Sequence, residues 1–70
     1  MNEETFNLSI RKFLKQFGVG AQREIELAVQ KALEAGRLRD NNFPATATLR
    51  IPSLDLEFTT ESRIDTGNGS

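Results

Sequence analysis

The spacing of apolar residues changes halfway along this 70-residue sequence, and that change constrains the fold more than any other feature. In the first half, large apolar residues recur every three or four positions, at Phe6, Ile10, Phe13, Leu14 and Phe17. That spacing is the period of an α-helix. In the stretch "ATATLRIPSLDLEF", apolar and polar residues alternate, which is the period of a β-strand. The sequence therefore predicts helices followed by strands.

The helical half contains Gly18-Val19-Gly20, which predicts a break between two helices. The first helix is expected at about residues 3–17, with Asn2 as its N-terminal cap. It is expected to end before Gly18, because glycine readily closes a helix C-terminus. The second is expected at about residues 21–35, with Gly36 as its stop. A connection of about three residues favours two adjacent, antiparallel helices.

The alternating half predicts a β-hairpin that turns near Pro52-Ser53. A two-residue loop would pair Leu49 with Leu56, whereas a four-residue loop would pair Leu49 with Phe58. Both registers keep the apolar residues on one face. Proline fixes φ near −65°, which does not suit the favoured two-residue turns, so the four-residue loop is preferred.

These elements predict an α+β fold of order α-α-β-β, in which an antiparallel helical hairpin packs on a two-stranded antiparallel β-hairpin. One domain is expected over residues 1–64, followed by a flexible tail over 65–70, because the tail has no large apolar residue and two glycines. The large apolar residues of both halves are expected to form the core: Phe6, Phe13, Phe17, Ile25, Val29, Leu49, Leu56 and Phe58.

Composition argues against several function classes. The chain has no cysteine and no histidine, which removes thiolate metal sites, the commonest metal ligand and the usual acid–base group near neutral pH. No group of residues suggests a catalytic site, a metal site or a small-molecule substrate, so we expect no enzyme and no cofactor. No apolar run is long enough to span a membrane, and the first residues do not resemble a signal peptide. A cytoplasmic protein without a membrane partner is expected.

Self-association or binding of another protein is the leading hypothesis for function. Leu8 and Leu27 lie roughly opposite the apolar faces of the two expected helices, and Leu38 lies beyond them. Such residues can gather into a patch that binds another chain. A subunit interface would also support a domain of this size, whose own core stabilises it only marginally.

A DNA-binding helix-turn-helix is the alternative, because "SIRKFLKQFGVGAQREIELAV" has a glycine-containing turn between two helical patterns. In that case Gln22 and Arg23 would read bases from the second helix, while Lys12 and Lys15 would contact phosphates. The net charge of −1 opposes this hypothesis, because nucleic-acid modules usually carry a basic excess.

The segments "MNEETFNLSIRKFLKQFGV" and "QREIELAVQKALEAG" resemble small bacterial proteins that are grouped as a domain of unknown function. The resemblance covers about residues 1–38 well and continues loosely through "SLDLEF". Members of that group carry Ser or Thr, a helix cap, just before "QREIE", where this chain has Gly20 and Ala21. The resemblance implies a small bacterial cytoplasmic protein and supplies no catalytic residues.

Overall fold

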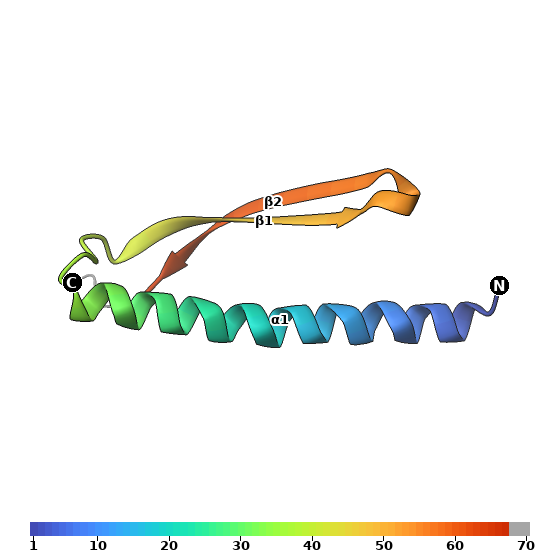
Figure 1. The fold of residues 1–70 in the computed structure, drawn as a ribbon, viewed down its shortest axis with the longest axis horizontal. Coiled ribbons are helices and arrows are strands. Elements are labelled where there is room, and N and C mark those ends of the chain that lie inside the picture. The colour runs from blue at the N-terminus through green and yellow to red at the C-terminus, as the bar shows by residue number, and fades with distance from the viewer. Residues whose placement is uncertain (68–70) are drawn as a thin grey trace. The chain divides into compact units, whose positions relative to one another are not determined.

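The computed structural model describes residues 1–67, which form one long helix and one β-hairpin. Helix α1 (Glu3–Glu34) is followed by strand β1 (Asn42–Ile51), a 3₁₀ turn η1 (Pro52–Leu54) and strand β2 (Leu56–Asp65) (Figure 1). The chain divides into two compact units, Met1–Leu38 and a second that begins at Arg39. The helix makes up most of the first unit, and the hairpin makes up most of the second.

Helix α1 begins where the sequence predicts, at the cap residue Asn2. The Asn2 side-chain oxygen accepts a hydrogen bond from the backbone N–H of Thr5 at 3.0 Å. This bond satisfies one of the free N–H groups of the first turn. Glu3 and Glu4 place negative charge at the positive end of the helix dipole. The predicted N-terminus is confirmed.

The helix ends at Glu34, and Gly36 closes it as predicted. Gly36 has a φ of +67°, a left-handed conformation that glycine adopts without steric cost. The N–H of Gly36 donates to the carbonyl of Leu33 at 3.1 Å, and the N–H of Arg37 donates to that of Ala32 at 2.8 Å. These two bonds form a Schellman motif, which satisfies carbonyls of the last turn.

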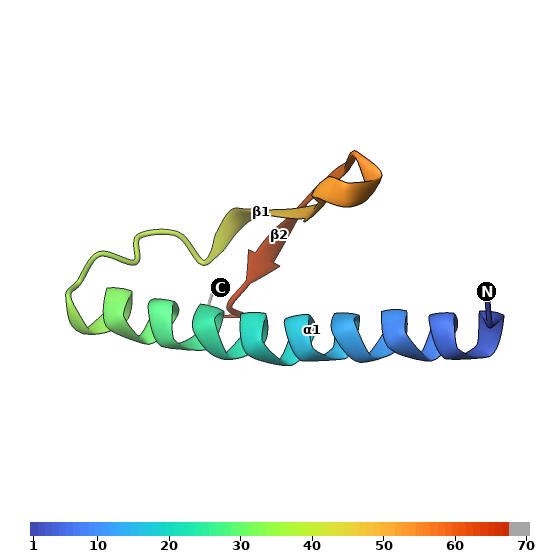
Figure 2. The ribbon, with the colours of Figure 1, turned by 45° about the vertical axis from the view of Figure 1, so that its right-hand side comes forward.

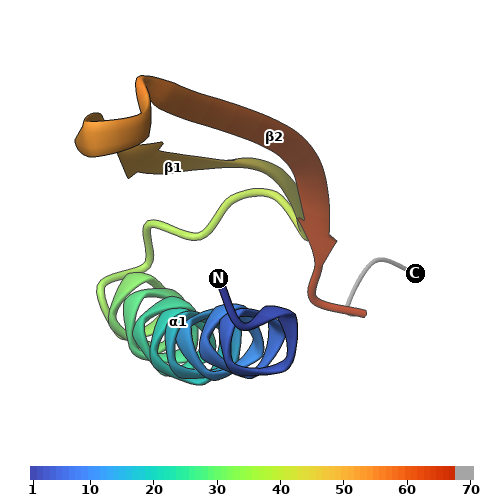
Figure 3. The ribbon, with the colours of Figure 1, turned by 90° about the vertical axis from the view of Figure 1, so that its right-hand side faces the viewer.

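The predicted α-α-β-β fold is wrong, because α1 continues through Gly18-Val19-Gly20 without a turn (Figures 1 and 2). Seen nearly end-on, its successive turns overlap (Figure 3). Neither glycine has a positive φ. A glycine within a helix costs about 1 kcal/mol relative to alanine, and strong helix formers on both sides offset that cost. Gly20 and Ala21 also offer no side-chain cap that could start a second helix.

The β-hairpin has the predicted register. Leu49 pairs with Phe58 and Ile51 pairs with Leu56, so residues 52–55 form the four-residue loop. Within this loop Asp55 adopts a left-handed conformation, with φ 52°, and its N–H donates to the Pro52 carbonyl at 3.1 Å. Aspartate tolerates this conformation better than most residues do. The strands twist about each other along the hairpin, as β-ribbons do (Figure 1).

The predicted core is also wrong, since no described residue is buried. The phenylalanines Phe6, Phe13 and Phe17 remain 49%, 49% and 53% exposed. Ile25, Leu56 and Phe58 are exposed as well, and only Val29 and Leu49 of the expected core are half-buried. The cause is the missing helical hairpin: the two halves of α1 lie end to end and cannot cover each other.

The expected single domain over residues 1–64 stays a prediction. At the start of the expected tail, Asp65 ends β2 and its side chain accepts a hydrogen bond from the Gly67 N–H at 2.8 Å. The Thr66 N–H donates to the Asn41 carbonyl at 2.8 Å. The rest of the predicted tail, residues 68–70, lies outside the described residues.

Candidate interaction surface

The most prominent feature of α1 is an apolar stripe that runs along most of its length. Successive residues of an α-helix are about 100° apart, so residues at spacings of three and four share one face. Nine apolar residues make up this stripe: Phe6, Ile10, Phe13, Leu14, Phe17, Ala21, Ile25, Ala28 and Ala32. Glu24 lies on the same face.

The stripe differs in character between its two ends. Its N-terminal half carries large side chains, among them Ile10, which is 38% exposed. Its C-terminal half carries alanines and Ile25, which is 40% exposed. The stripe is about 40 Å long at 1.5 Å rise per residue. Its phenylalanines all lie in one half and its alanines all lie in the other. Apolar surface of this extent usually marks an interaction site.

The face opposite the stripe carries the residues of the nucleic-acid hypothesis. Helical spacing places Lys12, Lys15, Gln22 and Arg23 together on it, although it also carries Glu26. A helix-turn-helix needs a second helix that enters the major groove. Because residues 3–34 form one helix, Gln22 and Arg23 lie in its middle and not at the start of a recognition helix.

The three predicted interface leucines do not form one patch. Leu8 and Leu27 are 58% and 45% exposed. They are separated by 19 residues of a continuous helix, which is about 28 Å along its axis and about 100° around it. Leu38 is half-buried and lies in the segment that follows the helix. The reason is again the absence of a turn, which would have folded Leu27 back toward Leu8.

The β-hairpin presents one apolar face and one polar face, because directly paired residues share a face. The apolar face has large pairs at both ends, with Leu49–Phe58 near the turn and Phe43–Ile64 near the open end. Smaller residues lie between them, in the pairs Ala45–Ser62 and Ala47–Thr60.

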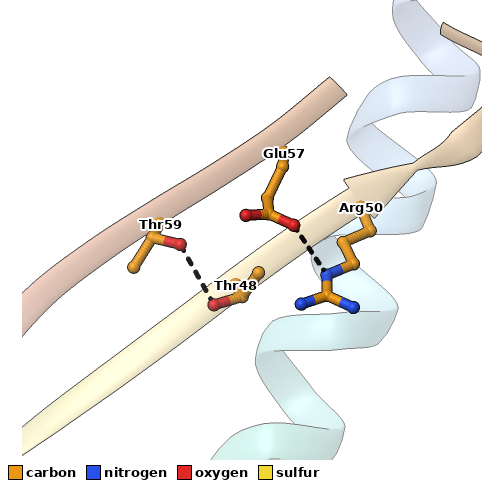
Figure 4. Close-up of polar contacts among 4 residues, drawn as sticks. All are labelled: Thr48, Arg50, Glu57 and Thr59. Atoms are coloured by element: carbon orange, nitrogen blue, oxygen red, sulfur yellow. Dashed lines mark hydrogen bonds and ion pairs between the residues drawn. The ribbon is translucent and has the colours of Figure 1, made fainter. Parts of the chain in front are cut away.

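The polar face carries a ladder of cross-strand contacts (Figure 4). The hydroxyls of Thr48 and Thr59 are 3.1 Å apart, and Arg50 Nε lies 3.1 Å from Glu57 Oε1. Toward the open end of the hairpin, Arg63 donates through Nε to the Asn42 side chain and through a terminal nitrogen to the Asn42 carbonyl at 3.2 Å. These contacts align the two strands and leave their polar atoms in water.

The chemistry of the remaining surface is limited among the described residues. An open depression of about 320 Å³ lies on the hairpin, lined by Pro44–Thr46 and Glu61–Arg63. Within residues 1–67, no three acidic side chains come close enough together to hold a metal ion. Although α1 has 32 residues, neither it nor any other described helix is apolar enough over a sufficient length to cross a membrane.

Sequence reasoning missed the stripe as one continuous surface, although a signal for it was present. Phe17 and Ala21 are four residues apart, so the apolar period crosses the two glycines without a change of phase. If a turn separated two helices here, the helical spacing of apolar residues would not be expected to continue across it. The unbroken period was therefore better evidence for the helix than the two glycines were against it.

Comparison with known protein families matches residues 1–67 to a family described as "Family of unknown function (DUF6494)". Comparisons with curated proteins and with solved structures found no match. The family match extends over α1 and both strands of the hairpin, and it confirms the resemblance seen in the first half of the sequence. The chain belongs to this family of unknown function.

Proposed function

We propose that this protein is a non-enzymatic protein–protein interaction module that binds through the apolar stripe of α1. The observation that carries the proposal is the exposure of the stripe's large side chains, which ranges from 38% for Ile10 to 53% for Phe17. Full burial of a large apolar side chain is worth about 1.5–3 kcal/mol, so leaving six of them about half exposed forgoes part of that stability. A protein surface that covers them would recover it.

The proposal moves the interface from Leu8, Leu27 and Leu38 to the stripe. In the predicted helical hairpin, the two halves of the stripe would have packed against each other and been buried. In one continuous helix those contacts are absent, so the stripe is open to another chain, whereas Leu8 and Leu27 are isolated from each other. A cytoplasmic location and a bacterial source belong to the same proposal, and cell fractionation tests the location.

Affinity capture with matched variants tests this function. The bait is the full tagged chain, either unchanged, with Phe13→Asp in the stripe, or with Leu8→Asp on the opposite face. The two replaced side chains have similar exposure, 49% and 58%. We expect the unchanged chain and Leu8→Asp to retain the same proteins, or a second copy of the chain, after nuclease treatment. Phe13→Asp should lose them.

Two results would contradict the proposal. If Phe13→Asp retained the same proteins as the unchanged chain, the stripe would not be the binding surface. If recovery depended on intact nucleic acid, the basic face around Lys12, Lys15 and Arg23 would become the candidate site instead. Circular dichroism of each bait shows that any loss of binding does not come from loss of the helix.

A further inference from the structure

We propose that the stripe of α1 binds the stripe of a second copy of this chain, with the two helices antiparallel. This inference rests on the proposed function and names the partner of the same surface. It draws on four observations: the spacing of the stripe residues, the sizes of their side chains, the length of the helix and the apolar area that the stripe offers.

Apart from Leu14, the stripe has the same spacing in both directions along the helix. The steps between the other eight residues are 4, 3, 4, 4, 4, 3 and 4. The stripe is centred on residue 19, and α1 is centred between residues 18 and 19. An antiparallel copy centred on residue 19 therefore places these eight residues opposite one another and Leu14 opposite Glu24. The two helix ends are then level to within about one residue.

Side-chain size also favours the antiparallel arrangement. It places Phe6 opposite Ala32 and Phe17 opposite Ala21. Ile10 then lies opposite Ala28, so three of the four distinct pairs join a large residue to an alanine. The fourth pair, Phe13 with Ile25, joins two large residues. Helices pack about 8–10 Å apart, and alternation of large and small residues fills that space evenly.

A parallel pair lacks this complementarity. It would place each stripe residue opposite its own copy, with phenylalanine against phenylalanine at one end and alanine against alanine at the other. The phenylalanines would hold the two helices apart at one end, and the alanines would leave a gap between the helices at the other. Both the crowding and the gap would cost stability. Parallel helices would also bring like ends of their dipoles together, along with both copies of Glu3 and Glu4.

The length of the stripe favours a second helix over the chain's own hairpin as its cover. From Phe6 to Ala32 the stripe extends about 39 Å at the rise of an α-helix. The apolar face of the hairpin, from Phe43 to Ile51, extends only about 27 Å at the rise of a strand. One hairpin therefore cannot cover the whole stripe, whereas a second α1 matches it along its full length.

The apolar area available is of the size that a specific dimer needs. A phenylalanine that is half exposed offers about 100 Å² for burial, so the three phenylalanines of two copies offer about 600 Å² together. Ile10, Ile25 and the alanines raise the total to about 1,000 Å², the lower limit expected of a biological interface.

Sedimentation equilibrium and disulfide crosslinking of the full chain test the inference together. The chain has no cysteine, so single cysteines can be introduced without interference. The two variants are Ile10→Cys and Ala28→Cys, which the antiparallel register places opposite each other. Within a dimer of either variant alone, the two cysteines would lie about 27 Å apart, beyond the reach of a disulfide.

We expect the unchanged chain to sediment as a dimer. On oxidation, a mixture of Ile10→Cys and Ala28→Cys should give a crosslinked dimer, and neither variant alone should do so. Phe13→Asp should weaken the dimer at least about 30-fold, the effect of losing a buried aromatic contact within an interface. Leu8→Asp, on the opposite face, should leave the dimer unchanged.

Two results would overturn the inference. A monomer at every concentration would exclude a second copy as the partner, and crosslinking of either variant alone would exclude the antiparallel arrangement. The capture experiment separates these failures from failure of the proposed function. A monomeric chain that retains other proteins through the stripe, and loses them with Phe13→Asp, would keep the function and remove only the identity of the partner.

Discussion

Helix α1 closes its backbone hydrogen bonds within single turns, whereas the β1–β2 hairpin joins residues as distant as Asn42 and Asp65. The helix is capped at both ends by hydrogen bonds between residues that are close in the sequence. The hairpin has a continuous ladder of paired residues, with polar contacts on one face and apolar pairs on the other. The two regions therefore differ in what holds them together: backbone hydrogen bonds within single turns for the helix, and pairing of residues distant in sequence for the hairpin.

The largest expected effect comes from Val19→Pro, which attacks the middle of the helix. Proline within a helix removes a hydrogen bond and clashes with the preceding turn, at a cost of about 3 kcal/mol. We expect a marked loss of helical signal in far-ultraviolet circular dichroism. If residues 18–20 were a turn between two helices, proline would fit there and the helical signal would be unchanged.

The next effect comes from a pair of glycine substitutions with opposite signs. Gly18 has a helical backbone and open space where a Cβ would lie, so Gly18→Ala should stabilise the helix by about 1 kcal/mol. Gly36 has a φ of +67°, so Gly36→Ala should destabilise its C-terminus by about 1 kcal/mol. Thermal unfolding followed by circular dichroism measures both. The same sign for both variants would contradict a helix that continues through Gly18 and is closed by Gly36.

Loss of the N-terminal cap should have a similar or slightly smaller effect. Asn2→Ala removes the acceptor for the Thr5 N–H and should cost about 1 kcal/mol. Asn2→Asp is the matched control, because aspartate caps equally well and adds favourable charge at the helix start. If both substitutions reduced stability equally, the Asn2 side chain would not be acting as a cap.

The smallest effect is expected on the polar face of the hairpin. Arg50 and Glu57 form an ion pair, but their side chains are 70% and 64% exposed. Solvent screens such a pair, so a double-mutant cycle with Arg50→Ala and Glu57→Ala should give a coupling below about 0.5 kcal/mol. That coupling should fall further as salt is added. A coupling above about 1 kcal/mol would show that this pair helps to hold the two strands together.

The sequence predicted the hairpin register and the two helix ends correctly, because at these places the conformational preference of one residue favours a single structure. The turn geometry of Pro52 selected the register that pairs Leu49 with Phe58, and Asn2 and Gly36 marked the helix ends. The prediction failed at Gly18 and Gly20, because a glycine permits a helix stop without requiring one. There the outcome depends on the summed helix preference of the flanking residues, which no single residue reveals.

That one error carried through to the candidate site. With two helices, the stripe residues would cover one another, so Phe6, Phe13 and Ile25 were expected in a core and only Leu8, Leu27 and Leu38 were left for an interface. With one helix, the same residues become the exposed surface. Exposure depends on which segments meet in space, and periodicity gives only the face on which a residue lies.

The distance between spin labels at Asn7→Cys and Gln30→Cys of one chain, diluted with unlabelled protein, tests the continuous helix most directly. These positions are 23 residues apart, which corresponds to about 35 Å along one continuous helix, and we expect a backbone separation close to this value. In a helical hairpin that turns at residues 18–20, the two positions would face each other at about 10 Å. A separation near 10 Å would contradict the continuous helix. It would also contradict the proposed interaction surface, since the two halves of the stripe would then cover each other and leave no open surface for a partner.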